Sequence, residues 1–243
     1  MGDIRTRLFV DGPLAAGQSV RIEGAQAHYL VNVLRLGAGE AVELFDGASG
    51  GWRAEIVEAG KRAVLLDVVA QERVQAMPPD VWLLFAPIKK ARTDFIVEKA
   101  TEMGVRRIRP VFTRYTNSER VRPDKLRAHC IEAAEQCGGT FVPELDAAAP
   151  LDRVLGDWPE DRRLMFCDET MVAETGLAAL RDAGQGPWAI LIGPEGGFAP
   201  EEAERIRAMP QAVSVTLGPR ILRADTAAVA ALTLWQAALG DWR

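Results

Sequence analysis

The chain has 243 residues, 48% of them hydrophobic, and a formal net charge of −5 at neutral pH, so it is long and apolar enough for a large buried core in one or two domains. The acidic balance argues against indiscriminate binding to nucleic acids. Charges interrupt the N-terminal segment, and no apolar run reaches the roughly 18 residues of a membrane span, so we expect a soluble cytoplasmic protein. The three cysteines and two histidines form no metal-ligand pattern, so we expect no metal site.

Residues 1–73 are predicted to form a small β-rich domain. Five short stretches separated by turn-forming glycines have the composition of strands: "RLFV", "SVRIEG", "EAVELFDG", "WRAEIVEAG" and "RAVLLDVV". One helix is predicted in "AQAHYLVNVLRLGAGE", with Tyr29, Val33 and Leu36 on one face. The polar segment "QERVQAMPPD" then predicts a linker, and a second domain is expected over residues 80–243.

The second domain alternates predicted strands with predicted helices. The strands are "VWLLFAP", "IRPVFT", "RRLMFCDE", "WAILIGP" and "VSVTLGP", and the helices are "KKARTDFIVEKATEMGV", "PDKLRAHCIEAAEQCGG", "PEEAERIRAM" and "DTAAVAALTLWQAALG". Asp225 is the expected N-cap of the last helix, and the three cysteines are expected to be small core residues. This alternation predicts an α/β fold with a parallel sheet.

Three of these strands end in a small residue followed by proline, at Ala86-Pro87, Gly193-Pro194 and Gly218-Pro219. Such turns carry little side-chain bulk and let a ligand approach the backbone. Ligands of α/β sheets bind outside the carboxyl ends of the strands. The repetition favours one pocket built from several loops, although three ordinary strand ends would have the same pattern.

The loop "GPEGGFAPEE" differs from known phosphate-binding loops. It has neither the lysine of a P-loop nor the three spaced glycines of a dinucleotide-binding fold. Pro194 lacks a backbone donor, and Glu195 would repel a bound phosphate. A nucleoside with a positive centre, such as S-adenosylmethionine, fits the loop better.

The loop "TLGPRILRADTAAVAAL" carries Arg220 and Arg223 next to a predicted strand end. Guanidinium groups at such a place suit a phosphate or a developing oxyanion. The segment from Lys89 to Arg127 also holds twelve basic residues against five acidic ones, a local charge of +7. A solvated helix face is the simpler interpretation of such a run, but its excess in an acidic protein indicates a surface for an anionic partner.

The last predicted helix is apolar around most of its circumference, from Ala227 to Leu239. A helix of this kind must be covered on all sides. A second subunit would provide that cover, as would complete burial within one subunit.

Five motifs together resemble one family. "HYLVNVLRLGAGE", "KATEMGVRRIRPVFT", "EAAEQCGG", "LIGPEGGFAPEE" and "LGPRILRADTA" occur in the order and spacing of the RsmE family, the small-subunit ribosomal RNA (uracil-N3) methyltransferases of the SPOUT superfamily. The resemblance covers nearly the whole chain. It implies a PUA-like RNA-binding β-barrel over residues 1–73 and a SPOUT methyltransferase domain with a C-terminal trefoil knot over residues 80–243. It also implies a homodimer, S-adenosylmethionine as cofactor, and a uridine in 16S rRNA of the small ribosomal subunit as substrate.

The resemblance also assigns candidate site residues. The expected cofactor-binding residues are Phe85, Ile192, Gly193, Pro194, Glu195, Gly196, Gly197, Leu217, Gly218, Ile221, Leu222, Arg223 and Thr226. The expected RNA-binding residues are Arg5, Arg7, Arg35, Lys89, Lys90, Arg92 and Arg114. The chain departs from the family pattern at Gly139, near Tyr115 and at Asp225, where the family has arginine, arginine and glutamate.

The implied reaction removes the proton from uridine N3, which spreads negative charge onto O2 and O4. We expect Arg223 to stabilise this anion and Arg220 to hold nearby RNA. Glu195, or Asp225, either accepts the proton or braces these arginines and the loop. Three other functions remain as alternatives: a SPOUT enzyme that methylates a ribose 2′-oxygen of rRNA or tRNA, a non-catalytic RNA-binding protein, and a nucleotide-dependent oxidoreductase, which the missing glycine pattern disfavours.

Overall fold

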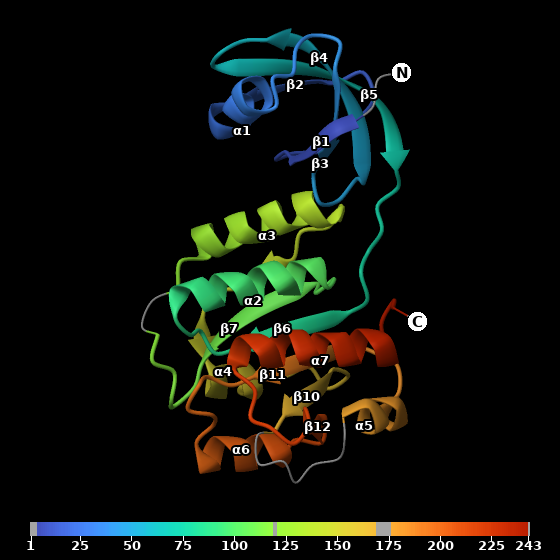
Figure 1. Cartoon of the computed structure of the whole chain (residues 1–243). Coiled ribbons are helices and arrows are strands. Elements are labelled where there is room, and N and C mark those ends of the chain that lie inside the picture. Colours follow the sequence, from blue (N-terminus) through green and yellow to red (C-terminus); the bar gives the residue numbers. More distant parts are fainter. Residues whose placement is uncertain (1–3, 119–120, 169–175, 243) are drawn as a thin grey trace. The chain divides into compact units, whose positions relative to one another are not determined.

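The computed structural model describes residues 4–118, 121–168 and 176–242 (Figure 1). The chain divides into two compact units. The first comprises Met1–Met77 and Ala134–Val142, and the second comprises Pro78–Ala133 and Pro143–Arg243. None of the described helices is long and apolar enough to cross a membrane.

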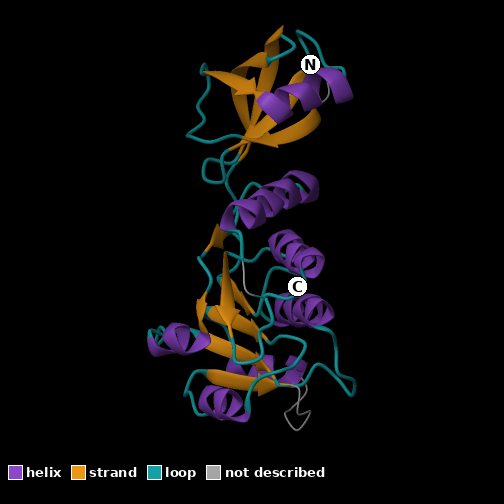
Figure 2. Ribbon diagram, turned by 90° about the vertical axis from the view of Figure 1, so that its left-hand side faces the viewer, coloured by secondary structure: helices purple, strands orange, loops and turns teal. Residues whose placement is uncertain are grey.

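The first unit is built on a five-stranded sheet with the order β1-β3-β4-β5-β2. Its strands are β1 (Ile4–Phe9), β2 (Ser19–Glu23), β3 (Ala41–Phe45), β4 (Gly51–Ala59) and β5 (Ala63–Arg73). β1 pairs with β3 in parallel and the other neighbours are antiparallel. The strands curve around a core that includes Leu44 and Leu66 (Figure 2). The prediction of a β-rich N-terminal domain is confirmed.

The helix in this unit differs from the prediction. The α-helix α1 (Gly24–His28) continues into a π-helical turn, η1 (Tyr29–Val33). Of the three residues predicted to share a face, Leu36 is buried, but Tyr29 and Val33 are 36% and 57% exposed, and the fully buried positions are Ala27 and Leu30. A π turn is wider than an α turn, so it shifts the apolar residues away from the 3.6-residue period on which the prediction rested.

Arg7 connects distant segments of the first unit through hydrogen bonds and an ion pair. Its Nη1 donates to the carbonyl oxygens of Ala134 and Glu135 at 3.1 and 3.2 Å, and its Nη2 donates to that of Gly139 at 2.6 Å. These carbonyls lie at the C-terminal end of α3 (Pro123–Cys137), where a cation also opposes the helix dipole. The Nε of Arg7 and the guanidinium of Arg73 both bind the carboxylate of Glu43. The Arg7 guanidinium is therefore engaged inside the protein.

We predict that Arg7→Met lowers the free energy of unfolding by about 2–4 kcal/mol, because it removes the donor to three carbonyl groups and one of the two cations that bind the buried Glu43 carboxylate. Urea-induced unfolding measures this change. Arg5→Met is the matched control, since Arg5 lies on the same strand with an exposed side chain, and we expect a change within about 0.5 kcal/mol. Equal effects of the two substitutions would contradict this account of Arg7.

The second unit contains a parallel sheet with the order β12-β10-β11-β6-β7-β8. Its strands are β6 (Val81–Phe85), β7 (Arg107–Phe112), β8 (Glu144–Leu145), β10 (Arg163–Cys167), β11 (Trp188–Ile192) and β12 (Ala212–Val215), and β9 (Ala149–Pro150) pairs with β7. The predicted parallel sheet is confirmed. The two-residue strands β8 and β9 were not predicted, because so few residues carry no periodicity.

Helices cover both faces of this sheet (Figure 2). Apart from α3, they are α2 (Lys90–Glu102), α4 (Leu151–Gly156), α5 (Gly176–Ala183), α6 (Pro200–Arg207) and α7 (Ala224–Ala238). Leu84, Phe166 and Leu191 form a core beneath α4 and α6, whereas α7 packs against α2, α5 and β11 on the other face. The short helix α4 was missed, as was α5, which begins just after residues that the structure does not describe.

Two details of the predicted helices are wrong. Cys137 is exposed, whereas the prediction made all three cysteines core residues, because α3 presents its last turn to the surface. Asp225 is not the N-cap of α7: the helix begins at Ala224 with Arg223 as N-cap, which places Asp225 in the first turn. An acidic residue there still complements the helix dipole.

Candidate active site

A pocket lies at the carboxyl ends of β10, β11 and β12, which are neighbours in the sheet. Its lining consists of Cys167, Asp168, Ile192, Gly193, Pro194, Phe198, Thr216, Leu217, Gly218, Arg220, Ile221, Leu222, Ala224 and Ala227. Two of the three small-residue-and-proline turns thus meet, as the sequence predicts. The third turn, Ala86-Pro87, does not line the pocket, and the backbone N–H of Ala86 instead donates to the carbonyl of Ile192 at 3.0 Å. The third side of the pocket is formed by Cys167 and Asp168, at the end of β10.

The loop after β12 is held by its own hydrogen bonds. The hydroxyl of Thr216 donates to the carbonyl of Gly218 at 3.2 Å, and the backbone N–H of Gly218 lies 3.3 Å from the same hydroxyl. Gly218 has a φ of +108°, a conformation that side chains disfavour. Leu217, Ile221 and Leu222 follow as apolar lining. This loop therefore offers backbone groups and apolar surface to a ligand.

Asp168 brings a buried carboxylate to the pocket. Its side chain is 5% exposed, and its Oδ2 accepts a hydrogen bond from the Nε of Arg207, on α6, at 2.7 Å. The hydrogen bond from Arg207 to Asp168 raises the pKa of the arginine, so the arginine stays charged. The sequence prediction missed Asp168, although an acid immediately after an apolar strand was a usable signal.

The thiol of Cys167, the residue before Asp168, is not a reactive group. Burial raises its pKa to about 12, so the thiol is protonated at neutral pH. A protonated thiol is a poor nucleophile and cannot accept a proton.

Glu195 and Asp225 both face Arg92 rather than Arg220 or Arg223. The Nη1 of Arg92 lies 4.0 Å from Oε1 of Glu195, and its Nε lies 3.7 Å from Oδ2 of Asp225. Arg92 is on α2, so this cluster joins α2, the glycine-rich loop and the start of α7. Bracing of the two arginines of the β12 loop was one of the roles considered for these acids, but the ion-pair partner that the structure gives them is Arg92, because the sequence did not reveal the proximity of α2.

Arg220 and Arg223 are exposed, and within the part of the chain that the structure describes neither forms an ion pair. Arg220 lines the pocket, whereas Arg223 stands at the start of α7, just beyond the lining. Both guanidinium groups are available to a substrate.

The expected cofactor-binding residues fall into three groups. Seven line the pocket: Ile192, Gly193, Pro194, Leu217, Gly218, Ile221 and Leu222. Glu195, Gly196, Gly197, Arg223 and Thr226 lie on the same loops or on the first turn of α7 without lining it, and Phe85 is fully buried in β6.

The expected RNA-binding residues also differ in placement. Lys89, Lys90, Arg92 and Arg114 belong to the second unit, where Lys89, Lys90 and Arg114 are exposed. Arg5 and Arg35 are exposed in the first unit, whereas Arg7 is engaged in the network described above.

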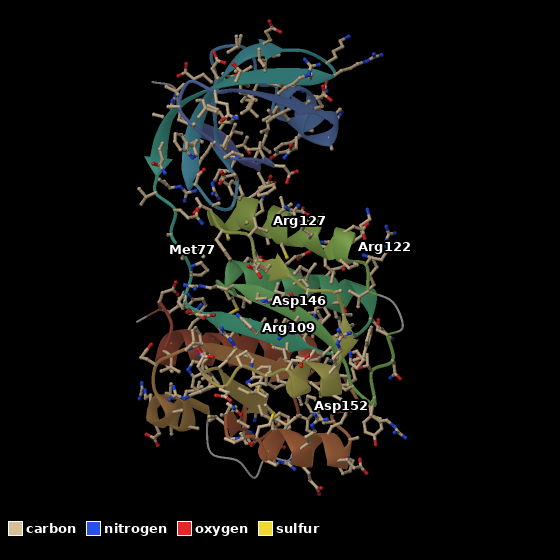
Figure 3. All side chains as sticks on the ribbon, turned by 180° about the vertical axis from the view of Figure 1, so that it is seen from behind. Met77, Arg109, Arg122, Arg127, Asp146 and Asp152 are labelled. Atoms are coloured by element: carbon tan, nitrogen blue, oxygen red, sulfur yellow. The ribbon has the colours of Figure 1, made fainter. Side chains whose placement is uncertain are left out.

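The basic run from Lys89 to Arg127 is not a single free surface. Arg107 and Arg109, on β7, bind Asp146 at 2.8 and 2.7 Å and lie over the ring of Trp82. Figure 3 labels Arg109 and Asp146. Arg120 and Glu119 lie outside the described residues. Part of the predicted cationic excess is therefore neutralised within the second unit.

The lining fits a positively charged nucleoside. Apolar side chains such as Ile192 and Leu222 suit a purine ring, and the Asp168 carboxylate suits a cation. No lysine contributes to the lining among the described residues. Those residues also include no group of three or more His, Cys, Asp or Glu side chains that could hold a metal ion.

Residues 75–236 match the family described as an RNA methyltransferase domain, and residues 22–69 match the RNA methyltransferase PUA domain. A ribosomal RNA small subunit methyltransferase E from Synechocystis sp. is 32% identical over 88% of this chain and 71% of its own length. The chain belongs to the ribosomal RNA small subunit methyltransferase E family. The family resemblance inferred from the sequence motifs is confirmed.

Other methyltransferases are similar to this chain over nearly its whole length. The protein of the same name from Rickettsia conorii is 27% identical over 93% of both chains. A putative methyltransferase from Legionella pneumophila, solved in complex with the bound cofactor SAM, is 30% identical, with a TM-score of 0.86 over 98% of this chain and 100% of its own. The ribosomal RNA small subunit methyltransferase E from Neisseria gonorrhoeae, bound to S-adenosyl methionine, is 26% identical, with a TM-score of 0.85 over 98% and 99%.

We predict that Gly218→Ala costs about 1–3 kcal/mol of stability, because alanine is strained at a φ of +108° even though the space around this glycine is open. Thermal unfolding measures the loss. Gly156→Ala, at the end of α4, is the control: its surroundings are equally open and its φ is ordinary, so we expect stability to stay the same or rise slightly. Equal stability of Gly218→Ala and the unmodified chain would refute the backbone argument.

Proposed function

We propose that the chain transfers a methyl group from S-adenosylmethionine to N3 of a specific uridine in the 16S rRNA of the small ribosomal subunit. The observation that carries this proposal is the pocket at the ends of β10, β11 and β12, with its apolar lining and its buried acid, Asp168, in a member of this methyltransferase family. Two similar proteins were solved with the same cofactor.

S-adenosylmethionine supplies an electrophilic methyl group when it is bound. Ile192, Leu217 and Leu222 would hold its adenosine part, and the carboxylate of Asp168 would offset its positive charge. The Thr216 hydroxyl, which donates to the carbonyl of Gly218, restrains the β12 loop, and such restraint lowers the cost of ordering a site when a ligand binds.

Arg223 stabilises the uracil anion that forms when N3 gives up its proton to solvent water, and Arg220 holds the RNA beside it. Both guanidinium groups lack an ion-pair partner among the described residues, so their charge is free to meet the charge on O2 and O4. Glu195 faces Arg92 instead, and we therefore assign it to holding the glycine-rich loop.

We predict that Arg223→Ala lowers kcat by about 100-fold or more, because one fixed donor to a developing anion contributes on this scale. Small subunits lacking the modification are incubated with labelled S-adenosylmethionine, and the rRNA is then copied by primer extension. Arg220→Ala is expected mainly to raise KM for the subunit. Arg181→Ala, an exposed arginine on α5, serves as the control and should leave both constants unchanged.

The same assay separates the alternatives. N3-methyluridine blocks base pairing and stops the polymerase, whereas a 2′-O-methyl group mostly permits its passage. If the rRNA gains label but the polymerase does not stop, the ribose 2′-oxygen replaces N3 as the methylated atom. If the rRNA gains no label and the chain does not bind the cofactor, the enzymatic proposal is refuted.

We also propose a homodimer formed through α7. One side of this helix is buried through Ala224, Ala228, Ala231, Leu232, Trp235 and Gln236. The opposite side presents a stripe of small or β-branched residues: Thr226, Val229, Ala230, Thr233 and Ala237. Ile221, just before the helix, is 76% exposed. A second copy would cover this stripe.

Ala230→Glu is expected to convert the dimer into monomers, because it places a charge in the centre of the stripe. Sedimentation velocity measures the mass of the particle. Ala128→Glu, on an exposed position of α3, is expected to leave the dimer intact. A monomeric unmodified protein, or an Ala230→Glu variant that stays dimeric, would contradict the proposed interface.

The domain bounds, the knot and the location in the cell accompany the proposed function. The domain bounds 1–73 and 80–243 are supported by the two family matches, and the segment 134–142, which groups with the first unit, belongs by sequence to the second domain. The trefoil knot implied by the resemblance would lie in the C-terminal part of that domain. A ribosomal substrate would place the protein in the cytoplasm.

A further inference from the structure

We propose that Tyr115 is a platform on which an unpaired base of the RNA substrate stacks beside the glycine-rich loop. This inference rests on the proposed function, because it requires an RNA substrate. The chain departs from the family pattern near this residue.

The loop that carries Tyr115 is fixed at both ends. After β7, the backbone N–H of Thr113 donates to the hydroxyl of Thr116 at 2.9 Å, and the N–H of Thr116 donates to the carbonyl of Thr113 at 3.2 Å. Between them, the N–H of Arg114 donates to Oε1 of Glu202 at 2.8 Å. The turn therefore holds Tyr115 at a defined place in the second unit.

Glu202 connects this turn to the glycine-rich loop. Its other carboxylate oxygen accepts a hydrogen bond from the N–H of Ala199 at 3.0 Å, at the start of α6. Ala199 directly follows Phe198, which lines the pocket. One carboxylate thus joins the turn of Tyr115 to the end of the loop that forms the pocket.

Tyr115 packs directly over that loop. A Cβ atom added to Gly196 would lie 3.2 Å from Cβ of Tyr115 and 3.7 Å from its Cγ. A side chain at this position would have to displace the tyrosine by a few tenths of an ångström. Gly196 is two residues beyond Pro194 of the pocket lining, so the ring is placed next to the proposed cofactor site.

The ring is nevertheless accessible, since Tyr115 is 43% exposed. Arg114 precedes it in the chain, and Glu195, which pairs with Arg92, precedes Gly196. A supported and accessible aromatic ring matches the way proteins hold single-stranded RNA, where bases stack on aromatic side chains.

The stacking role predicts which substitutions matter. Tyr115→Leu keeps an apolar side chain over Gly196 but removes the aromatic face, so KM for the small subunit should rise by about 5- to 100-fold, in line with the loss of one stacked base. Tyr115→Phe keeps the ring and should stay within about 2-fold of the unmodified chain. KM for S-adenosylmethionine should not change in either variant.

The experiment measures both KM values and the thermal unfolding of the full chain, with unmethylated small subunits and S-adenosylmethionine as substrates. Trp242→Ala is the control, because Trp242 is an exposed aromatic residue beyond the C-terminal end of α7, whereas the site is at its N-terminal end. The proposal is supported if Tyr115→Leu alone raises KM for the subunit.

Three results would overturn the proposal. If Tyr115→Leu raises KM for S-adenosylmethionine and lowers the unfolding temperature, the residue only supports the loop. If Tyr115→Leu and Tyr115→Phe behave alike, the aromatic face is irrelevant. An unmodified chain that methylates no rRNA removes the proposed function and the stacking role together, whereas an active chain that is insensitive to Tyr115→Leu removes the stacking role alone.

Discussion

The parallel pairing of β10 with both β11 and β12 is the constraint on which the candidate site depends. The three strands run in the same direction as neighbours, so the loops that follow them emerge together at one edge of the sheet. Each loop then contributes something different: Asp168 a buried carboxylate, the glycine-rich loop a close backbone approach, and the β12 loop an apolar lining with Arg220.

Charge is distributed around this site in two ways. The acidic side chains are paired: Asp168 with Arg207, and Glu195 and Asp225 with Arg92. Arg220 and Arg223, by contrast, carry charge that no described residue neutralises by an ion pair. The free cations attract an anionic substrate, and the carboxylates beside them offset part of the positive potential that a positively charged cofactor would meet.

The sequence was sufficient for features that repeat along the chain or lie within one loop. The strand and helix alternation predicted the parallel sheet, and the composition of "GPEGGFAPEE" separated the loop from phosphate-binding loops. Features that depend on distant residues were missed. Nothing local shows that Arg7 binds carbonyl groups at the end of α3, or that Arg92 of α2 lies between Glu195 and Asp225. The π turn at Tyr29–Val33 was missed for a different reason, since it breaks the period on which helix prediction relies.

The exposure of Arg207 does not reveal its role in the protein. Its side chain is 37% exposed, yet its Nε is the partner of the most deeply buried acid of the pocket. A survey that ranks positions by accessibility would treat Arg207 as freely replaceable. Its loss would instead remove an ion-pair partner from a buried carboxylate, so this exposed position on α6 is constrained by the pocket behind it.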